Sequence, residues 1–171
     1  AYISRELQPT PVLSFLVREL KCKSGIMVTA SHNPAKYNGY KCYGEDGCQM
    51  TDVNAGTVYD EIQKVDIFNG LIEWVDESVY ETYLDNVQAQ TVNKDICKNA
   101  GLKVVYTPLN GAGNKLVRKI LARIGVEDIT VVPEQENPDG NFTTCPYPNP
   151  EIREALDLGL KLSEKVGADL L

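Results

Sequence analysis

The second half of the 171-residue chain alternates short apolar runs with longer amphipathic segments. Residues 102–106, 129–132 and 168–171 are short runs of strand character, while residues 116–124 and 151–166 carry apolar side chains at helical spacing. A β-α-β-α-β order of this kind is typical of a parallel sheet with right-handed crossovers. We therefore predict an α/β fold of two consecutive units, with mainly parallel mixed sheets flanked by helices.

The first half of the chain shows the same two periodicities in shorter pieces. Leu13, Leu16, Val17 and Leu20 follow the i, i+3, i+4, i+7 spacing of one helix face, and Gly25 ends the segment. Thr51 and Asp52 can cap a later helix. The other elements predicted here are strands at 26–28 and 40–43, a return strand at 48–50, and helices over about 52–64 and 77–90.

The charge balance argues against one class of partner. The chain has 24 acidic and 17 basic residues, a net charge of -7. An acidic surface disfavours extended contact with a phosphate backbone, so we expect no nucleic-acid partner. A pocket for a single phosphate is still possible because a few residues determine it.

The cysteine pattern gives no metal or disulfide framework. Five cysteines occur, with no CxxC pair and only one histidine in the chain, so a zinc site would need an unusual ligand set. We interpret the cysteines as reduced thiols of a cytoplasmic protein. They are Cys22, Cys42, Cys48, Cys97 and Cys145.

The chain shows no targeting or membrane signal. No basic region precedes an apolar stretch at the start, and no apolar run approaches the roughly 18 residues of a spanning helix. We therefore expect no membrane partner. The chain begins at Ala1, without an initiator methionine, and residues 168–171 resemble a strand stopped midway. These features lead us to expect a piece of a longer protein.

Ser31 is the strongest candidate for chemistry. It follows the apolar run 26–28 and precedes His32-Asn33-Pro34, at the carboxyl end of a predicted strand, where α/β sheets bind ligands. Pro34 lacks an amide donor and biases Asn33 away from helix. Residue types alone allow two interpretations: a hydroxyl presented for reaction, or a turn serine bonded to its own backbone.

Three further features are compatible with phosphate chemistry. His32 could act as a general base or a donor beside Ser31, or could simply shape the loop. Lys41, on the next predicted strand, could stabilise phosphoryl oxygens or be a solvated strand lysine. Gly111-Ala112-Gly113 precedes a helix but lacks the glycine-rich phosphate-binding fingerprints, so it is interpreted as a tight turn.

The hexapeptide TASHNP at 29–34 resembles the active-serine loop of the α-D-phosphohexomutases, the family of phosphoglucomutase and phosphomannomutase. Further resemblances follow in family order along nearly the whole chain. The tract YKCYGEDGCQ at 40–49 is most similar to the longer phosphoglucomutases and phosphopentomutases. The other matching runs are YNGYK (37–41), VVYTPLNGAG (104–113), PDGNF (138–142), PNPE (148–151) and GAD (167–169).

The resemblance implies a division of the chain. Residues 1–76 would be the later part of the family's first domain, with the active-serine loop, and residues 77–171 most of its second domain. The metal loop would follow Leu171, and the sugar-selecting domains would lie outside the chain. The remaining domains of the parent chain would be its partners, and this piece by itself would be inactive.

The resemblance also implies a mechanism. Ser31 would carry a phosphoryl group, pass it to a sugar monophosphate to form a bisphosphate, and recover the other phosphate, so that phosphate exchanges between carbons one and six. Lys41 would transfer a proton or stabilise phosphate, and His32 and Asn33 would shape the loop and bond phosphate oxygens. Mg²⁺ would be bound through the phosphate on Ser31 and by aspartates that this chain lacks, and glucose 1,6-bisphosphate would be the intermediate and activator.

Several alternatives to a phosphoglucomutase stay open. The sugar specificity could be that of a phosphomannomutase or a phosphopentomutase, because the selecting loops lie outside the chain. Water could take the phosphoryl group from Ser31, which would make the protein a phosphatase. A non-catalytic paralogue that binds sugar phosphates is the third alternative, and the presence of both Ser31 and Lys41 argues against it.

Overall fold

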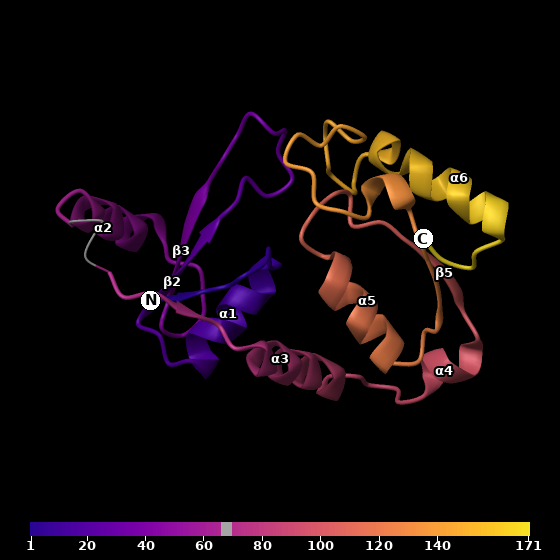
Figure 1. Ribbon diagram of the computed structural model, residues 1–171, viewed down its shortest axis with the longest axis horizontal. Helices are drawn as coiled ribbons and strands as arrows, with labels where there is room; N and C mark the ends of the chain where they lie inside the picture. The colour runs from indigo at the N-terminus through magenta and orange to yellow at the C-terminus, as the bar shows by residue number, and fades with distance from the viewer. Residues whose placement is uncertain (66–69) are drawn as a thin grey trace. The chain divides into compact units, whose positions relative to one another are not determined.

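The computed structural model describes residues 1–65 and 70–171, which form two compact units (Figure 1). Unit 1 comprises Ala1–Thr29 and Asn38–Tyr83, and unit 2 comprises Ala30–Tyr37 and Leu84–Leu171. The segment Ala30–Tyr37 is flanked on both sides by unit 1 in the sequence, yet it packs with unit 2. This assignment matters because the segment contains Ser31.

A helix packed on a hairpin forms the core of unit 1. Helix α1 (Thr10–Glu19) packs on β2 (Ser24–Val28), which pairs antiparallel with β3 (Tyr40–Gly44). The helix and strand approach so closely that a Cβ on Gly25 would lie 2.5 Å from Cγ2 of Val17. Val17 is almost fully buried, and burial of such a side chain stabilises the fold by about 1.5–3 kcal/mol. The predicted helix and both strands are therefore confirmed, although Ile26 and Val28 in the first strand are 48% and 65% exposed.

The predicted return strand after β3 is only a single bridge. Tyr43 and Gln49 form that antiparallel bridge, beside a turn in which the amide of Gly47 donates to the carbonyl of Gly44 over 2.9 Å. The turn is held by the Ser14 hydroxyl, which donates to the Gly47 carbonyl over 2.7 Å. Two backbone hydrogen bonds flank the bridge, from the Gly44 amide to the Cys48 carbonyl over 2.9 Å and from the Met50 amide to the Cys42 carbonyl over 2.8 Å.

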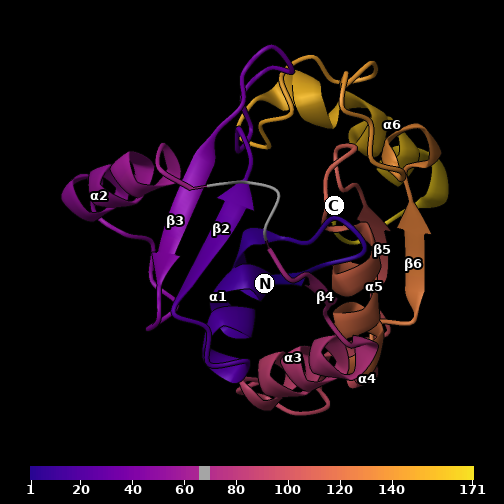
Figure 2. The same cartoon turned by 60° about the vertical axis from the view of Figure 1, so that its left-hand side comes forward.

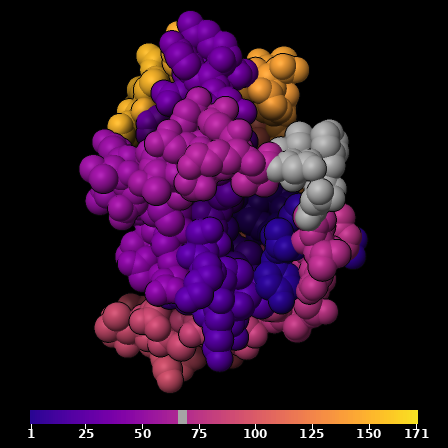
Figure 3. All heavy atoms as spheres, turned by 90° about the vertical axis from the view of Figure 1, so that its left-hand side faces the viewer, coloured from indigo at the N-terminus to yellow at the C-terminus, as the bar shows by residue number. Residues whose placement is uncertain are grey.

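Helix α2 (Asp52–Ile62) is the predicted helix at 52–64 in slightly shorter form. Thr51 is at its N-cap position, but its side chain makes no capping hydrogen bond, so the expected cap is wrong. None of the helix residues is buried, and Figure 3 shows this segment on the surface of the molecule. The helix therefore contributes little to the core of unit 1.

Unit 1 also contains a strand pair that the sequence did not predict. Strand β1 (Tyr2–Ile3) pairs in parallel with β4 (Glu73–Trp74), about seventy residues later. Both strands are exposed, and the guanidinium of Arg5 lies 4.8 Å from the Trp74 ring centre. Helix α3 (Glu77–Ala89) follows and continues from unit 1 into unit 2.

Unit 2 is built on a parallel sheet, as the alternating pattern predicts. Strands β5 (Lys103–Tyr106) and β6 (Asp128–Val131) lie side by side in Figure 2, with Val105 opposite Thr130. Leu170 adds a parallel bridge to Val104, where a further strand was expected. The α/β fold class is thus confirmed.

Unit 2 contains three further helices. Helix α5 (Asn114–Arg123) connects the two strands, and α6 (Asp157–Val166) packs against β5. The short helix α4 (Ile96–Ala100) precedes β5 and was not predicted. No helix in the described part of the chain has the length and apolar character that a membrane crossing requires.

The last predicted helix starts later than expected. It was predicted from residue 151, but residues 149–152 form a turn in which the Glu151 amide donates to Asn149 Oδ1 over 3.0 Å. A 3₁₀ turn (η2, Arg153–Leu156) follows, and α6 begins at Asp157. Because Asn149 also accepts the Ile152 amide on its carbonyl, over 3.0 Å, the local turn replaces the first helical hydrogen bonds.

Candidate active site

The loop that carries Ser31 has an unusual backbone. Ser31 adopts φ 59°, in the left-handed region that non-glycine residues seldom occupy. Local turns on either side hold it, since the Asn33 amide donates to the Ala30 carbonyl over 3.1 Å and the Tyr37 amide to the Pro34 carbonyl over 3.0 Å. The Ser31 side chain is exposed. Strained backbone of this kind clusters at functional sites.

Ser31 lies on the wall of a cavity in unit 2 of about 270 Å³. Three of the residues that line the cavity, Ser31, Leu109 and Phe142, have positive φ angles of 59°, 50° and 49°. The remainder of the lining is formed by Tyr106, Thr107, Pro108, Gly111, Pro148 and Pro150. Strained backbone is therefore concentrated around this cavity.

One wall of the cavity is the segment that follows β5. Tyr106 ends the strand, and a Cβ on Gly113 would lie 2.7 Å from the Tyr106 hydroxyl oxygen, so a larger residue there would displace the tyrosine hydroxyl. Burial raises the pKa of Tyr106, which keeps the phenol protonated. Thr107 then accepts the Leu109 amide on its hydroxyl over 3.1 Å and fixes the turn into residues 108–111.

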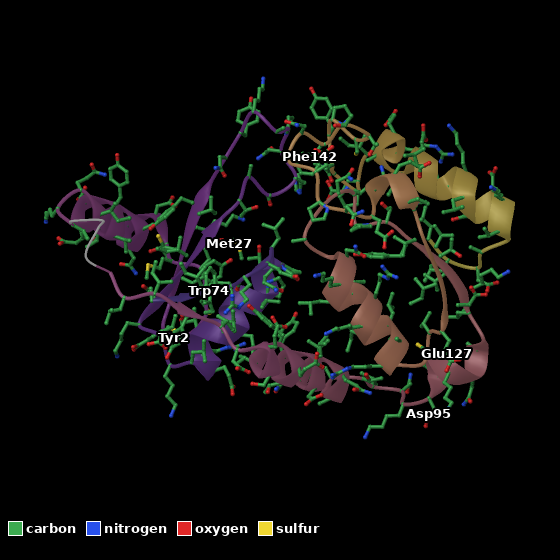
Figure 4. The ribbon with its side chains drawn as sticks, in the orientation of Figure 1. Tyr2, Met27, Trp74, Asp95, Glu127 and Phe142 are labelled. Atoms are coloured by element: carbon green, nitrogen blue, oxygen red, sulfur yellow. The ribbon has the colours of Figure 1, made fainter. Side chains whose placement is uncertain are left out.

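The other wall is the long proline-containing loop between β6 and η2, where Phe142 lies (Figure 4). Its turn at Asp139 is closed by two amides, because Asn141 N–H donates to Oδ1 and Thr143 N–H to Oδ2, both over 2.9 Å. The amide and hydroxyl of Thr143, followed by the amide of Asn141, lower the pKa of Asp139. Within this loop, Cys145 is buried in a cluster with Leu109.

Of the four predicted site residues, only Ser31 lines the cavity. Ser31 lines the cavity, whereas the neighbouring His32 and Asn33 are exposed and do not line it. Lys41 belongs to unit 1, where it lies on β3 opposite Met27 and is half-buried. The roles of His32, Asn33 and Lys41 in phosphate chemistry therefore stay predictions.

Family models match both parts of this chain. Residues 1–67 match the phosphoglucomutase/phosphomannomutase alpha/beta/alpha domain I, and residues 81–171 match domain II of the same family. The chain belongs to the phosphoglucomutase/phosphomannomutase family. The resemblance that begins at TASHNP is therefore confirmed.

Curated relatives extend along almost the whole chain. A phosphoribomutase of Saccharomyces cerevisiae is 36% identical and aligns with 97% of this chain, over 30% of its own length. Phosphoglucomutases of Staphylococcus haemolyticus and Staphylococcus epidermidis are 35% and 37% identical and align with 99% of this chain, over 33% of their lengths. The chain thus spans about a third of these mutases.

Solved structures of the family share the fold. A Thermus thermophilus protein assigned as a phosphomannomutase superposes with a TM-score of 0.78 and 27% identity over 94% of this chain and 36% of its own. The open form of parafusin, a phosphoglucomutase of Paramecium, gives a TM-score of 0.59 at 17% identity over 96% of this chain and 35% of its own. The second likeness supports the fold alone.

Clustered metal ligands are absent from the described part of the chain. Within residues 1–65 and 70–171, no three His, Cys, Asp or Glu side chains gather as ligands for an ion. The Mg²⁺ expected from the resemblance therefore stays a prediction.

Two buried polar residues of the site were missed in the sequence. Asn110 is 6% exposed and Gln135 is 1% exposed, and both bond across from one wall of the cavity to the other. The Leu109-Asn110-Gly111 run contained a signal, because asparagine tolerates left-handed backbone and Asn110 has φ 57°. Nothing in the sequence indicated that Gln135 is buried, since a glutamine between turns is ordinarily exposed.

Proposed function

We propose that this chain is the part of a phosphohexomutase that carries the phosphoryl group, and that Ser31 is the residue that carries it. The observation that supports this most is the combination of an exposed serine residue and a left-handed backbone at the rim of a cavity, in a chain of this family. A rigidly presented hydroxyl suits phosphoryl transfer, which depends mainly on positioning.

In the proposed reaction, phosphate moves twice. The P–O bond to Ser31 Oγ breaks as a hydroxyl oxygen of a sugar monophosphate bonds to phosphorus. The attacking hydroxyl loses its proton, and Ser31 Oγ gains one, so that a serine hydroxyl and a sugar bisphosphate result. The resulting bisphosphate returns its other phosphate to Ser31 Oγ by the reverse chemistry. We propose Lys41 for proton transfer or charge stabilisation, and His32 and Asn33 for shaping the loop and bonding phosphate oxygens.

We propose glucose phosphates as the substrate pair, with glucose 1,6-bisphosphate as the intermediate and activator and Mg²⁺ as the metal of the full-length protein. The relatives named as phosphoglucomutases are 35% and 37% identical, and the phosphoribomutase is 36% identical, so identity alone does not separate hexose from pentose phosphates. Phosphomannomutase and phosphopentomutase activity are therefore alternatives. The proposal includes a cytoplasmic location, which the five unpaired cysteines support.

The test is a serine substitution in the full-length protein. Ser31→Ala removes the phosphoryl acceptor, so mutase turnover in a coupled glucose 6-phosphate assay should fall at least about a thousandfold. Ser24→Ala is the matched control, because Ser24 is also exposed and begins β2, the strand that precedes the Ser31 loop. Retention of near-wild-type turnover by Ser31→Ala would overturn the proposal, and release of free phosphate without isomer formation would favour the phosphatase.

We also propose that the 171-residue chain by itself does not turn over sugar phosphates. It spans about a third of the relatives' length, and the other domains of the parent chain would be its partners for selecting the sugar. Purified chain incubated with glucose 1-phosphate, the bisphosphate and Mg²⁺ should form no glucose 6-phosphate. Detectable Ser31-dependent turnover would contradict this part of the proposal.

A further inference from the structure

The Asn110 side chain is a buried connection between the two walls of the cavity. Its amide nitrogen donates to the carbonyl of Asn137 over 2.8 Å and to that of Glu134 over 3.3 Å. Its amide oxygen accepts the Thr144 hydroxyl over 2.9 Å. One side chain thus bonds three residues of the long loop, and it is 6% exposed.

The backbone of Asn110 adds two more connections to the same loop. Its N–H donates to the Gln135 carbonyl over 2.9 Å, and its carbonyl accepts the Asp139 N–H over 3.1 Å. Asp139 in turn accepts the amide of Phe142 on its carbonyl over 3.0 Å. Because Phe142 lines the cavity, a hydrogen-bonded path runs from Asn110 to the opposite wall.

The neighbours of Asn110 form the first wall directly. Leu109 and Gly111 both line the cavity, and Asn110 between them has φ 57°. Asparagine suits this position for two reasons: it tolerates left-handed backbone, and its side chain carries both hydrogen-bond donors and an acceptor. Aspartate would present an oxygen to the two carbonyls, and alanine would leave them without a donor in a buried site.

We propose that Asn110 is a positioning residue for phosphoryl transfer at Ser31. By fixing the separation of the two walls, it fixes the cavity on whose rim the Ser31 hydroxyl lies. This inference rests on the proposed function of Ser31 and adds a residue that acts through the cavity wall rather than by touching the phosphoryl group. A displacement of the wall by about 1 Å is enough to lower a rate of this kind up to about a hundredfold.

The experiment compares Asn110→Gly with Asp95→Gly in the full-length protein. Glycine accepts the left-handed backbone at either position, so Asn110→Gly removes the side-chain bonds without adding backbone strain. Asp95 has φ 68° in unit 2, and its side chain makes no capping hydrogen bond. We expect Asn110→Gly to lower kcat about 10- to 100-fold with KM within about twofold, and Asp95→Gly to change neither.

Thr144→Val is the second variant, for the case in which Asn110→Gly does not fold by circular dichroism. It removes only the hydroxyl that donates to Asn110, from an exposed residue, and should lower kcat about three- to tenfold at constant KM. A merely structural role would lower the melting temperature without this selective loss of kcat.

The outcomes separate the two hypotheses. If the wild type shows no Ser31-dependent turnover, the proposed function fails and this inference fails with it. If turnover depends on Ser31 but a folded Asn110→Gly matches Asp95→Gly in kcat, only the positioning role is overturned. Should Asn110→Gly not fold, an unchanged kcat in Thr144→Val overturns it in the same way.

Discussion

Helix α2 and the loop between β6 and η2 differ in side-chain burial, and the less regular of the two segments is the more buried one. Helix α2 is regular over eleven residues, yet none of its side chains is buried, and Val53 and Tyr59 are 79% and 63% exposed. The loop contains only one 3₁₀ turn (η1, Pro133–Gln135), yet Gln135 and Cys145 are 1% and 3% exposed.

The comparison teaches that regular backbone and tertiary packing are separate properties of this chain. The helix satisfies the backbone groups of its interior through its own hydrogen bonds and buries no residue against the rest of unit 1. The loop cannot do so, and its polar groups are instead satisfied by buried partners such as Asn110. We therefore expect the loop to be the more sensitive region to substitution, although it is the less regular one.

The largest effect is expected for Gln135→Ala in the loop. The Gln135 side chain accepts the Thr107 hydroxyl over 2.7 Å, so truncation leaves a cavity and a polar group without its partner. We expect a loss of about 2–4 kcal/mol in the free energy of unfolding, measured by denaturant titration of the chain.

Gln63→Ala is the matched control for that substitution, because Gln63 is the exposed C-cap residue of α2. It should change the free energy of unfolding by no more than about 0.5 kcal/mol. If the two substitutions changed the free energy of unfolding equally, the loop would not be more tightly packed than the helix, and the proposed difference between the two regions would be wrong.

A smaller effect is expected on acidification, through Asp139. Hydrogen bonds from Thr143 and Asn141 lower its pKa, so its stabilisation of the turn is present above the ordinary pKa of about 3.9 and is lost as pH falls through the lowered value. Amide exchange measured by NMR from pH 7 to 3 should show the amides of residues 141 and 143 losing protection only in the acid range.

The Asp139→Asn variant should remove this acid dependence, because an amide oxygen does not titrate. Asp60→Asn on α2 is the control and should leave the acid-induced opening of the loop unchanged. If the loop opens at the same pH in Asp139→Asn as in the wild type, another group controls the turn.

The parts of the fold that the sequence predicted are those with a long periodic signal. Apolar spacing located α1, α5 and the strands β5 and β6. Helix α1 and strand β5 bury residues of their apolar runs, whereas the apolar residues of α5 and β6 are only half-buried. The β1 and β4 pair escaped prediction, since two residues carry no periodicity and their pairing joins distant parts of the chain. The start of α6 lies at Asp157 rather than at the predicted residue 151, because the Asn149 turn and the prolines beside it interrupt the helical backbone.

The candidate site was predictable only in part. The position of Ser31 after a strand and before Pro34 indicated a presented loop, and the motif resemblance indicated which family uses it. The supports of that loop's cavity were not predictable, because Asn110 and Gln135 are polar residues in a turn and a proline-containing segment. Their burial arises from hydrogen bonds between residues about 24 to 34 positions apart, for which local patterns give no signal.

The smallest effect is expected for Gly56→Ala in α2, and it has the opposite sign. A Cβ at Gly56 would meet no atom within 4 Å, so alanine fits and removes the cost of about 0.5–1 kcal/mol that glycine imposes in a helix interior. Because α2 buries none of its residues, we expect this gain to stay local: amide protection within α2 should rise about two- to fivefold while the unfolding midpoint of the chain hardly moves. A rise of several degrees in that midpoint would instead mean that α2 unfolds together with the core of unit 1, and the separation between regular backbone and tertiary packing would not hold for this helix.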